Sequence, residues 1–295
     1  MYKTNFFSSI NDAISQYLKE IKLDILYGFS VYDLLKLYFI GIIQGAISNR
    51  ASSISFSFFM ALFPFLLFVL NLIPFFPIEN FDKIFLDFIQ SLIPKESAVF
   101  FHEIFLDINN KKRGGLLSST FIFSIILIGN GINSIFDCFS NSYHVEFSRG
   151  FFKQYLYAIL VGFILITIIL VAASFSVLFD LLIQQNIFVI SEILLLIKYL
   201  FLIGFSLLVF SSLYFFGSIQ GRNLKFVSPG SIMTTVLLFL STYLFGIYIE
   251  NFATYNELYG SIGALIIMMI YIWINSISLI LGFELNVVIY KLKNN

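Results

Sequence analysis

Polar side chains recur at helical spacing inside the most apolar parts of this chain. Asn130, Asn133 and Asp137 lie three and four residues apart, which places them on one face of a helix. A second set repeats this spacing close to the C-terminus and consists of Asn275, Ser278, Gly282, Glu284 and Asn286. These side chains could line a polar path, along which Asp137 or Glu284 could carry a proton. The alternative is helix packing, in which small residues allow close approach and asparagines bond across helices.

The stretch SNRASSISFSFFMALFPFLL adds serines, an arginine and a proline to sequence that should cross a bilayer. Ser48, Ser52 and Ser55 fall on one helical stripe. Pro64 removes a backbone hydrogen bond and bends the helix. A bent helix with a hydroxyl face suits the wall of a cavity open to the cytoplasm, and it also suits plain packing.

Arg50 precedes this stretch and can pair with Asp137, with Glu284 or with a lipid phosphate. We expect it at the mouth of a polar cleft that opens to the cytoplasm or the inner leaflet. The residues predicted to line this cleft are Arg50, Ser52, Ser55, Asn130, Asn133, Asp137, Asn275, Glu284 and Asn286. Of these, the side chains expected to point into the helical bundle are Asn130, Asn133, Asp137, Glu284 and Asn286.

A third candidate site is the sequence Ser228-Pro229-Gly230, which is typical of a helix start. The positive end of that helix would lie beside Arg222 and Lys225. Together with Ser228 they could contact a phosphate or a lipid headgroup. The alternative is that the two basic residues only anchor the orientation of the chain.

The elements that must position these residues are membrane helices. Hydrophobic residues make up 59% of the chain and charged residues 12%, and the mean hydropathy is +0.94. Since a spanning helix needs about 20 apolar residues, the charges delimit six spans, at 51–78, 114–136, 154–179, 193–221, 226–249 and 258–283. The sequence therefore predicts an all-α, polytopic membrane protein with six transmembrane helices and amphipathic interfacial helices.

The predicted domains follow from these spans. Residues 1–50 are expected to form cytoplasmic amphipathic helices, and residues 51–290 a six-helix membrane domain. The membrane domain includes an outer helical pair at 80–109, and residues 291–295 form a cytoplasmic tail. Eleven lysines and arginines fall on the side of the termini and five on the other, so both termini are predicted to be cytoplasmic.

Enzyme chemistry has little support in the sequence. His102 and His144 fall on opposite sides of the membrane in this topology and cannot share a metal. Glycine-rich phosphate loops and nucleophile elbows are absent, and Cys138 is the single cysteine. We therefore predict no catalytic residues, no cofactor and no metal. The net charge of zero implies no nucleic-acid partner.

Several segments together resemble the YihY/BrkB family of bacterial inner-membrane proteins. They include ASSISFSFFMALFPFLL, INSIFDCFSNSYHVEFSRGFFKQ and IYIWINSISLILGFELNVVI. The segment SPGSIMTTVLLFLSTYLFGIYIENFATYNELYGSIGALI extends the likeness, which covers about residues 33 to 290. The positions that match the family pattern are Pro64, Asn141, Tyr143, Arg149, Gly150, Tyr259, Gly260, Gly282, Glu284 and Asn286. The serine-rich start of the first span, and Tyr271 and Trp273 in reversed order, depart from it.

The resemblance implies six spans, a place in the bacterial inner membrane and a role in the cell envelope. The ribonuclease label once given to the family fits this chain badly. Our leading hypothesis is a non-enzymatic transporter or transfer partner for a lipid or another amphiphile, working with membrane lipids and a periplasm-spanning lipid-transfer protein. The first span is then the expected gatepost of a lateral gap. The alternative is a scaffold that docks a periplasmic partner through residues 80–109, and a membrane-embedded hydrolase or nuclease ranks last.

Overall fold

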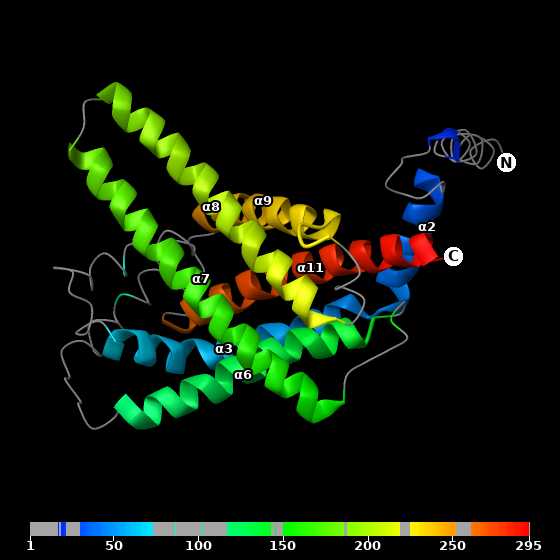
Figure 1. Cartoon of the computed structure of the whole chain (residues 1–295), viewed down its shortest axis with the longest axis horizontal. Helices are drawn as coiled ribbons and strands as arrows, with labels where there is room; N and C mark the ends of the chain where they lie inside the picture. The colour runs from blue at the N-terminus through cyan, green and yellow to red at the C-terminus, as the bar shows by residue number, and fades with distance from the viewer. Residues whose placement is uncertain are drawn as a thin grey trace.

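The computed structural model describes residues 17, 19–21, 30–72, 86, 102, 117–142, 145, 150–185, 188–218, 225–251 and 261–294. The long elements of these ranges are all helices (Figure 1). They are α2 (Val31–Gln44), α3 (Ile47–Leu72), α6 (Leu117–Ser140), α7 (Phe151–Gln185), α8 (Phe188–Gly217), α9 (Pro229–Asn251) and α11 (Ser261–Asn294). The predicted all-α fold is confirmed, and each of the six predicted spans overlaps one helix from α3 to α11.

The helices have the length and composition of membrane spans. Four helices of the described chain can cross a bilayer, and the bent pair α2–α3 makes a fifth. The described apolar part of α6, Ile125–Ser140, is shorter. The protein is therefore a multi-pass membrane protein. The predicted outer pair at 80–109 falls outside the described residues except for Leu86 and His102.

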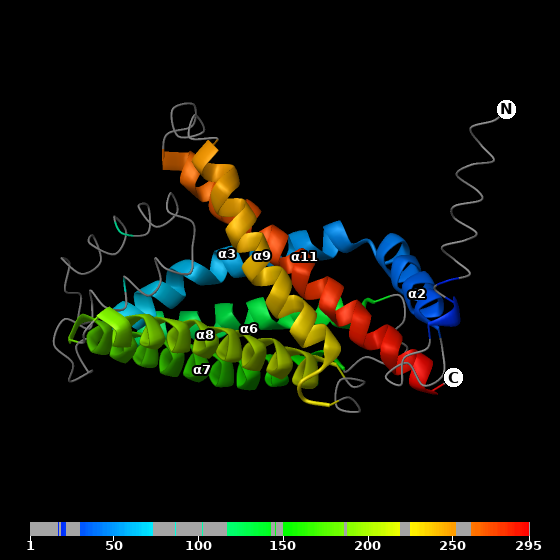
Figure 2. The same ribbon diagram turned by 90° about the horizontal axis from the view of Figure 1, so that it is seen from above.

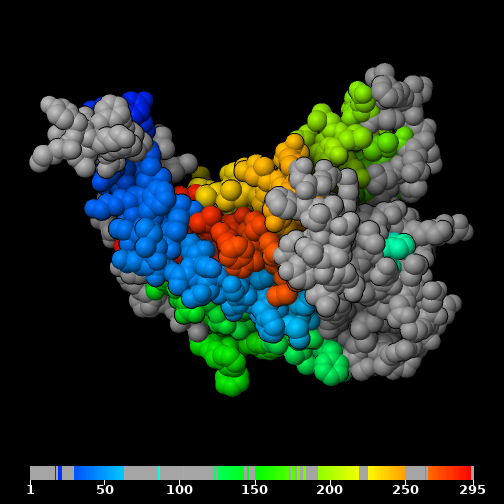
Figure 3. Space-filling model, turned by 180° about the vertical axis from the view of Figure 1, so that it is seen from behind, coloured from blue at the N-terminus to red at the C-terminus, as the bar shows by residue number. Residues whose placement is uncertain are grey.

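A bend of 64° separates α2 from α3. Ser30 begins α2 with a capping box, in which its hydroxyl accepts from the Asp33 amide and the Asp33 carboxylate accepts from the Ser30 amide. Gly45 ends the helix, and Ala46 has a positive φ of 45°. Apolar side chains of α2 pack against the end of α11, and the Tyr38 hydroxyl donates to the Leu281 carbonyl at 3.2 Å. Figure 3 shows α2 and α3 running beside α11.

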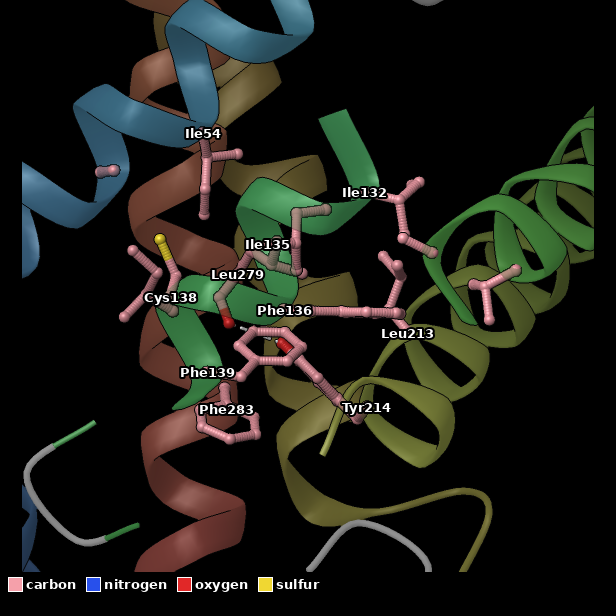
Figure 4. Packing of buried hydrophobic residues seen from close by; sticks show 14 of the residues in the cluster. Ile54, Ile132, Ile135, Phe136, Cys138, Phe139, Leu213, Tyr214, Leu279 and Phe283 are labelled. Carbon is pink, nitrogen blue, oxygen red and sulfur yellow. Dashed lines mark hydrogen bonds between the residues drawn. The ribbon is translucent and has the colours of Figure 1, made fainter. Parts of the chain in front are cut away.

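The six long helices form a closed ring. Along this ring α3 contacts α6, which contacts α7, and the contacts continue through α8, α9 and α11 back to α3. At one end the interior of the ring is filled by a hydrophobic core from α3, α6, α7, α8 and α11 (Figure 4). Phe139 of α6 stacks on Phe283 of α11 with ring centroids 3.9 Å apart, and Tyr214 of α8 packs against both rings. We call this the Arg50 end of the ring, because Arg50 of α3 is buried there.

At the opposite end the ring opens between α8 and α9. Figure 2 shows that these helices lie close together where α8 ends and α9 begins, and diverge from there. The buried residues described on α8 all lie within its last seven positions, 211–217. The far end of α9 packs instead on α11, where Phe245 and Ile249 meet Ile267. The pair α7–α8, which we call the arm, therefore has the buried end of α8 at the Arg50 end, where it contacts the rest of the bundle.

Candidate functional site

A buried ion pair joins α3 to α11 at the Arg50 end. Arg50 Nη1 lies 2.7 Å from Glu284 Oε1, with side-chain exposures of 9% and 0%. The sequence left three partners open for Arg50, and the structure pairs it with Glu284. Arg50 is buried at this position and does not stand at an open mouth, which corrects the placement expected from sequence.

The same guanidinium also bonds two backbone carbonyls. Nη1 donates to Gly45 O at 3.2 Å, in the bend between α2 and α3, and Nη2 donates to Cys138 O at 2.6 Å, in the last turn of α6. The Cys138 thiol returns a bond to the Arg50 carbonyl at 3.2 Å. A cation is favourable at the C-terminal end of a helix because the unpaired carbonyls there carry partial negative charge. Arg50 thus fixes the bend, α6 and α11 relative to one another.

Glu284 has a second partner that the sequence did not indicate. The Ser142 hydroxyl donates to Glu284 Oε2 at 2.8 Å, and Ser142 is 5% exposed. Both carboxylate oxygens are therefore bonded. A carboxylate in an apolar bundle is stable only when it is paired and hydrogen-bonded in this way.

Asn286, two residues after Glu284, caps the start of α9. Its Oδ1 accepts from the Gly230 amide at 2.8 Å, and its Nδ2 donates to the Ser228 hydroxyl at 2.8 Å. That hydroxyl also accepts from the Ser231 amide. Ser228 is 2% exposed, so its hydroxyl faces protein instead of a headgroup. Lys225 is exposed, whereas Arg222 lies outside the described residues, and a phosphate contact there stays a prediction.

The helices α9 and α11 cross at two glycines. A Cβ added to Gly282 would lie 2.6 Å from both the Gly230 carbonyl oxygen and the Tyr214 hydroxyl, and it would collide with Thr234 Oγ1. The Tyr214 hydroxyl bonds the Leu279 carbonyl at 2.8 Å and Thr234 Oγ1. Only glycine allows the backbones to approach this closely.

The polar face of α6 is oriented differently from the prediction. Asn130 and Asp137 are exposed and Asn133 is half-buried, so the prediction that this face points into the bundle is wrong for the first two. Glu284 and Asn286 do point inward, as predicted. The face of α6 that packs inward carries larger apolar residues, among them Phe136 and Phe139. Their burial turns the polar face outward.

Asp137 and Asn133 bond to a residue that the sequence did not single out. Gln154, 5% exposed at the start of α7, donates from Nε2 to Asp137 Oδ1 at 2.5 Å and to Asn133 Oδ1 at 3.2 Å. Asn133 Nδ2 donates to Asp137 Oδ2 at 3.0 Å. We call Asn133, Asp137 and Gln154 the amide–carboxylate cluster. In the sequence, the only sign of a role for Gln154 is that a glutamine stands at the start of an apolar run.

Three serines of the first span, Ser53, Ser55 and Ser57, bond to neighbouring helices. Ser55 is 3% exposed and donates to Met269 O of α11 at 3.2 Å. Ser53 and Ser57 both contact the Ser134 hydroxyl of α6, at 3.2 and 3.0 Å. Ser52 is exposed and donates to the Ser48 carbonyl of its own helix. Ser52 and Ser55 therefore do not share a buried stripe, and the packing alternative describes Ser55.

Asn275 also serves a contact between helices. Its Oδ1 accepts from the Ser241 hydroxyl of α9 at 2.9 Å, and its Nδ2 donates to the Tyr271 carbonyl. One turn away the Tyr271 hydroxyl meets Thr242 Oγ1 of α9 at 2.8 Å. These bonds hold α9 against α11 along the part where α8 has left it.

The remaining family positions are described in part. Asn141 and Gly150 are exposed at the ends of α6 and α7, and the Asn141 amide donates to the Asp137 carbonyl. For Pro64 the structure describes only the helical backbone. Tyr143, Arg149, Tyr259 and Gly260 lie outside the described residues. Within the described residues, no three His, Cys, Asp or Glu side chains come together as metal ligands.

Comparison with known proteins gives one match to a family over most of the chain. Residues 41–295 match the family described as Virulence factor BrkB. A protein of Bacillus subtilis (strain 168), named YfkH and described as ribonuclease-like, is 30% identical over 253 residues, covering 83% of this chain and 90% of its own. A UPF0761 membrane protein of Xanthomonas oryzae is 34% identical over 62 residues, 21% of this chain and 15% of its own. No solved structure matches.

Proposed function

Because the chain belongs to the Virulence factor BrkB family of membrane proteins, we propose that it is a non-enzymatic transporter or transfer partner for a lipid or another amphiphile. It acts in the bacterial inner membrane with both termini in the cytoplasm, and a periplasm-spanning protein is its partner. The observation that carries the proposal is the divergence of α8 and α9 away from the Arg50 end (Figure 2).

An amphiphile that leaves one leaflet must enter a protein sideways, between two helices. In a closed ring such a path needs a seam at which neighbouring helices separate. The seam is bordered by two helices that carry exposed apolar side chains, such as Ile203 of α8 at 42% and Phe239 of α9 at 40%. Acyl chains can occupy it without the loss of a hydrogen bond. This supports a seam between the fourth and fifth spans in place of a gatepost at the first span.

The Arg50 end supplies the fixed part that a lateral seam requires. There the ion pair, the cap of α9 and the aromatic stack hold α3, α6, α9 and α11 together. The arm α7–α8 is cohesive in itself, because Phe201 of α8 packs against Phe175 and Phe179 of α7. A cohesive arm on a fixed base can change the width of the seam by a hinge motion.

The test uses glycines at which added bulk meets no protein atom. A Cβ at Gly204 of α8 or at Gly246 of α9 has nothing within 4 Å, and the same is true of Gly150, which lies at the other end of α7. We expect Gly204→Trp and Gly246→Trp to slow lipid transfer in proteoliposomes while the protein keeps its fold. Gly150→Trp is the matched control and should transfer at the rate of the unaltered chain.

Equal transfer by all four proteins would contradict a path at the seam. Absence of transfer with the unaltered chain, with a periplasmic partner supplied, would favour the scaffold. The name of the Bacillus relative calls for a direct control as well. Purified protein incubated with RNA, with and without divalent cations, should leave the RNA intact, and cleavage that follows the protein through purification would contradict the non-enzymatic proposal.

A further inference from the structure

We propose that the exposed face of α6 is a binding site for a lipid with a primary-ammonium headgroup, with Asp137 as the residue that receives the ammonium. This site lies on the flank formed by α6 and α7. It does not depend on the seam between α8 and α9. It is a lipid-recognition site on the outer surface of the ring, in addition to any transport path.

The Asp137 carboxylate is held in a fixed orientation, but only part of its capacity to accept hydrogen bonds is used. Asn133 and Gln154 each direct one amide N–H to one of its oxygens. Gln154 is itself 5% exposed, and its Oε1 accepts from the Ser140 hydroxyl. Each carboxylate oxygen can accept a further bond, and the Asp137 side chain is exposed. The cluster therefore presents an oriented acceptor to the outside of the protein.

The charge around this acceptor favours a cation. Asp137 lies in the last turn of α6, where the partial charge of the helix end is negative. A carboxylate is disfavoured in that position unless a positive charge approaches it. Among the described residues no lysine or arginine pairs with Asp137. Within that part of the chain the carboxylate has no counter-charge, and a positively charged ligand would supply one.

The rest of the face has the profile of a lipid. At 100° per residue, the positions within about 60° of Asp137 on α6 include both polar and apolar residues. They are Ser140, Ser134, Asn133, Asn130, Ile126, Phe123, Ile122 and Ser119, and the apolar ones are Ile126, Phe123 and Ile122. The three apolar residues are 44%, 62% and 58% exposed, in that order. From Asp137 to Phe123 the helix rises about 21 Å, which exceeds the about 15 Å of one leaflet's hydrocarbon and leaves room for a headgroup.

The class of headgroup follows from the acceptor. A primary ammonium has three N–H donors and a full charge, so it can bond a carboxylate directly. A trimethylated ammonium keeps the charge but has no N–H, and an anionic headgroup is repelled. The structure thus predicts the order phosphatidylethanolamine, then phosphatidylcholine, then phosphatidylglycerol for this face.

The test measures lipid retention. The full chain is placed in nanodiscs with equal parts of these three lipids, released into mild detergent, and the retained lipids are counted by native mass spectrometry. We expect phosphatidylethanolamine to be retained about fivefold over phosphatidylcholine, the ratio of one hydrogen-bonded charge contact near a surface. Asp137→Asn should abolish this preference and Asp137→Glu should keep it. Glu192→Gln, at an exposed acid of α8, should change nothing.

Two results would overturn the proposal. One is a preference that is absent in the unaltered chain or unchanged in Asp137→Asn with equal thermal stability. The other is displacement of the lipid by a soluble amine. The exposed apolar residues of the face lead us to expect that the ammonium belongs to a lipid. Phosphorylethanolamine without acyl chains should fail to displace the retained lipid at millimolar concentration. Displacement by it at that concentration would show a site for a soluble amine.

Discussion

Gly230 and Gly282 face each other where α9 crosses α11, and each occupies the place that a Cβ on the other would need. The contact brings the start of α9 against the middle of the last helix. Around it lie the Tyr214–Thr234 bond and the Asn286 cap. Small substitutions at this crossing should therefore have large effects.

Gly282→Ala should lower the melting temperature in detergent. The added methyl collides with Thr234 and Tyr214, a cost of about 1–3 kcal/mol that exceeds the gain of about 1 kcal/mol from better helix propensity. Gly204→Ala makes the same change where nothing lies within 4 Å, and it should leave the melting temperature unchanged or raise it. Equal shifts in both variants would contradict the close crossing.

Glu284→Gln and Arg50→Met should each destabilise the protein strongly. Breaking a buried pair leaves an uncompensated charge, at a cost of about 3–5 kcal/mol. The double variant Arg50→Met/Glu284→Gln leaves no buried charge, so it should be less destabilised than the sum of the single variants. A thermodynamic cycle of melting curves measures the coupling. Additive effects would show that the 2.7 Å contact contributes nothing.

Asn286→Ala should weaken the start of α9 and spare its far end. The Gly230 amide and the Ser228 hydroxyl both lose a partner, which costs about 1–3 kcal/mol for a buried group left without a bond. Hydrogen exchange followed by mass spectrometry should show faster exchange in the peptide that contains residues 228–235. The peptide around Phe245, which packs on α11, is the internal control. Faster exchange along the whole of α9 would point to global loosening instead of a lost cap.

Ser52→Leu and Ser55→Leu should separate the two kinds of serine in the first span. Ser52 is exposed and bonds only within its own helix, so leucine there should change stability by less than about 0.5 kcal/mol. Ser55 is 3% exposed and bonds α11. Leucine there must enter a filled space, at a cost of about 1–3 kcal/mol. Similar melting temperatures for the two variants would contradict this assignment.

The orientation of the chain can be tested at its C-terminal end. Lys293 is exposed in the last turn of α11, and the charge distribution predicts that it lies in the cytoplasm. Lys293→Cys in a Cys138→Ser background should react with a membrane-impermeant maleimide only after the inner membrane is permeabilised. Reaction in sealed spheroplasts would reverse the predicted topology.

The helices could be predicted because long apolar runs between charges have few alternatives in a membrane. The direction of a helical face was harder to predict. The spacing of Asn130, Asn133 and Asp137 fixes that they share a face, but it does not say which way the face points. That is decided by competition with the apolar residues Phe136 and Phe139, which fill the core at the Arg50 end.

The sequence limited the candidate partners of a side chain on another helix, but it could not decide between them. Arg50 had Glu284 among its candidates, and the choice depended on how α3 and α11 rotate against each other. The roles of Ser142 and Gln154 could not be predicted, because a single serine after a helix, or a single glutamine at the start of one, has no periodic signal. Their roles come entirely from tertiary contacts with Glu284 and Asp137.

The ion pair at the Arg50 end also sets an order of assembly during synthesis. Glu284 follows Arg50 by 234 residues, so α3 enters the membrane long before its counter-charge has been made. Until α11 arrives, the guanidinium has only the carbonyls of Gly45 and, later, Cys138 to bond. The last helix therefore supplies the counter-charge, and a chain that stops before it leaves the Arg50 guanidinium without an acidic partner. Quality-control proteases would meet such truncated chains as unfinished proteins, however many of the earlier spans had already inserted.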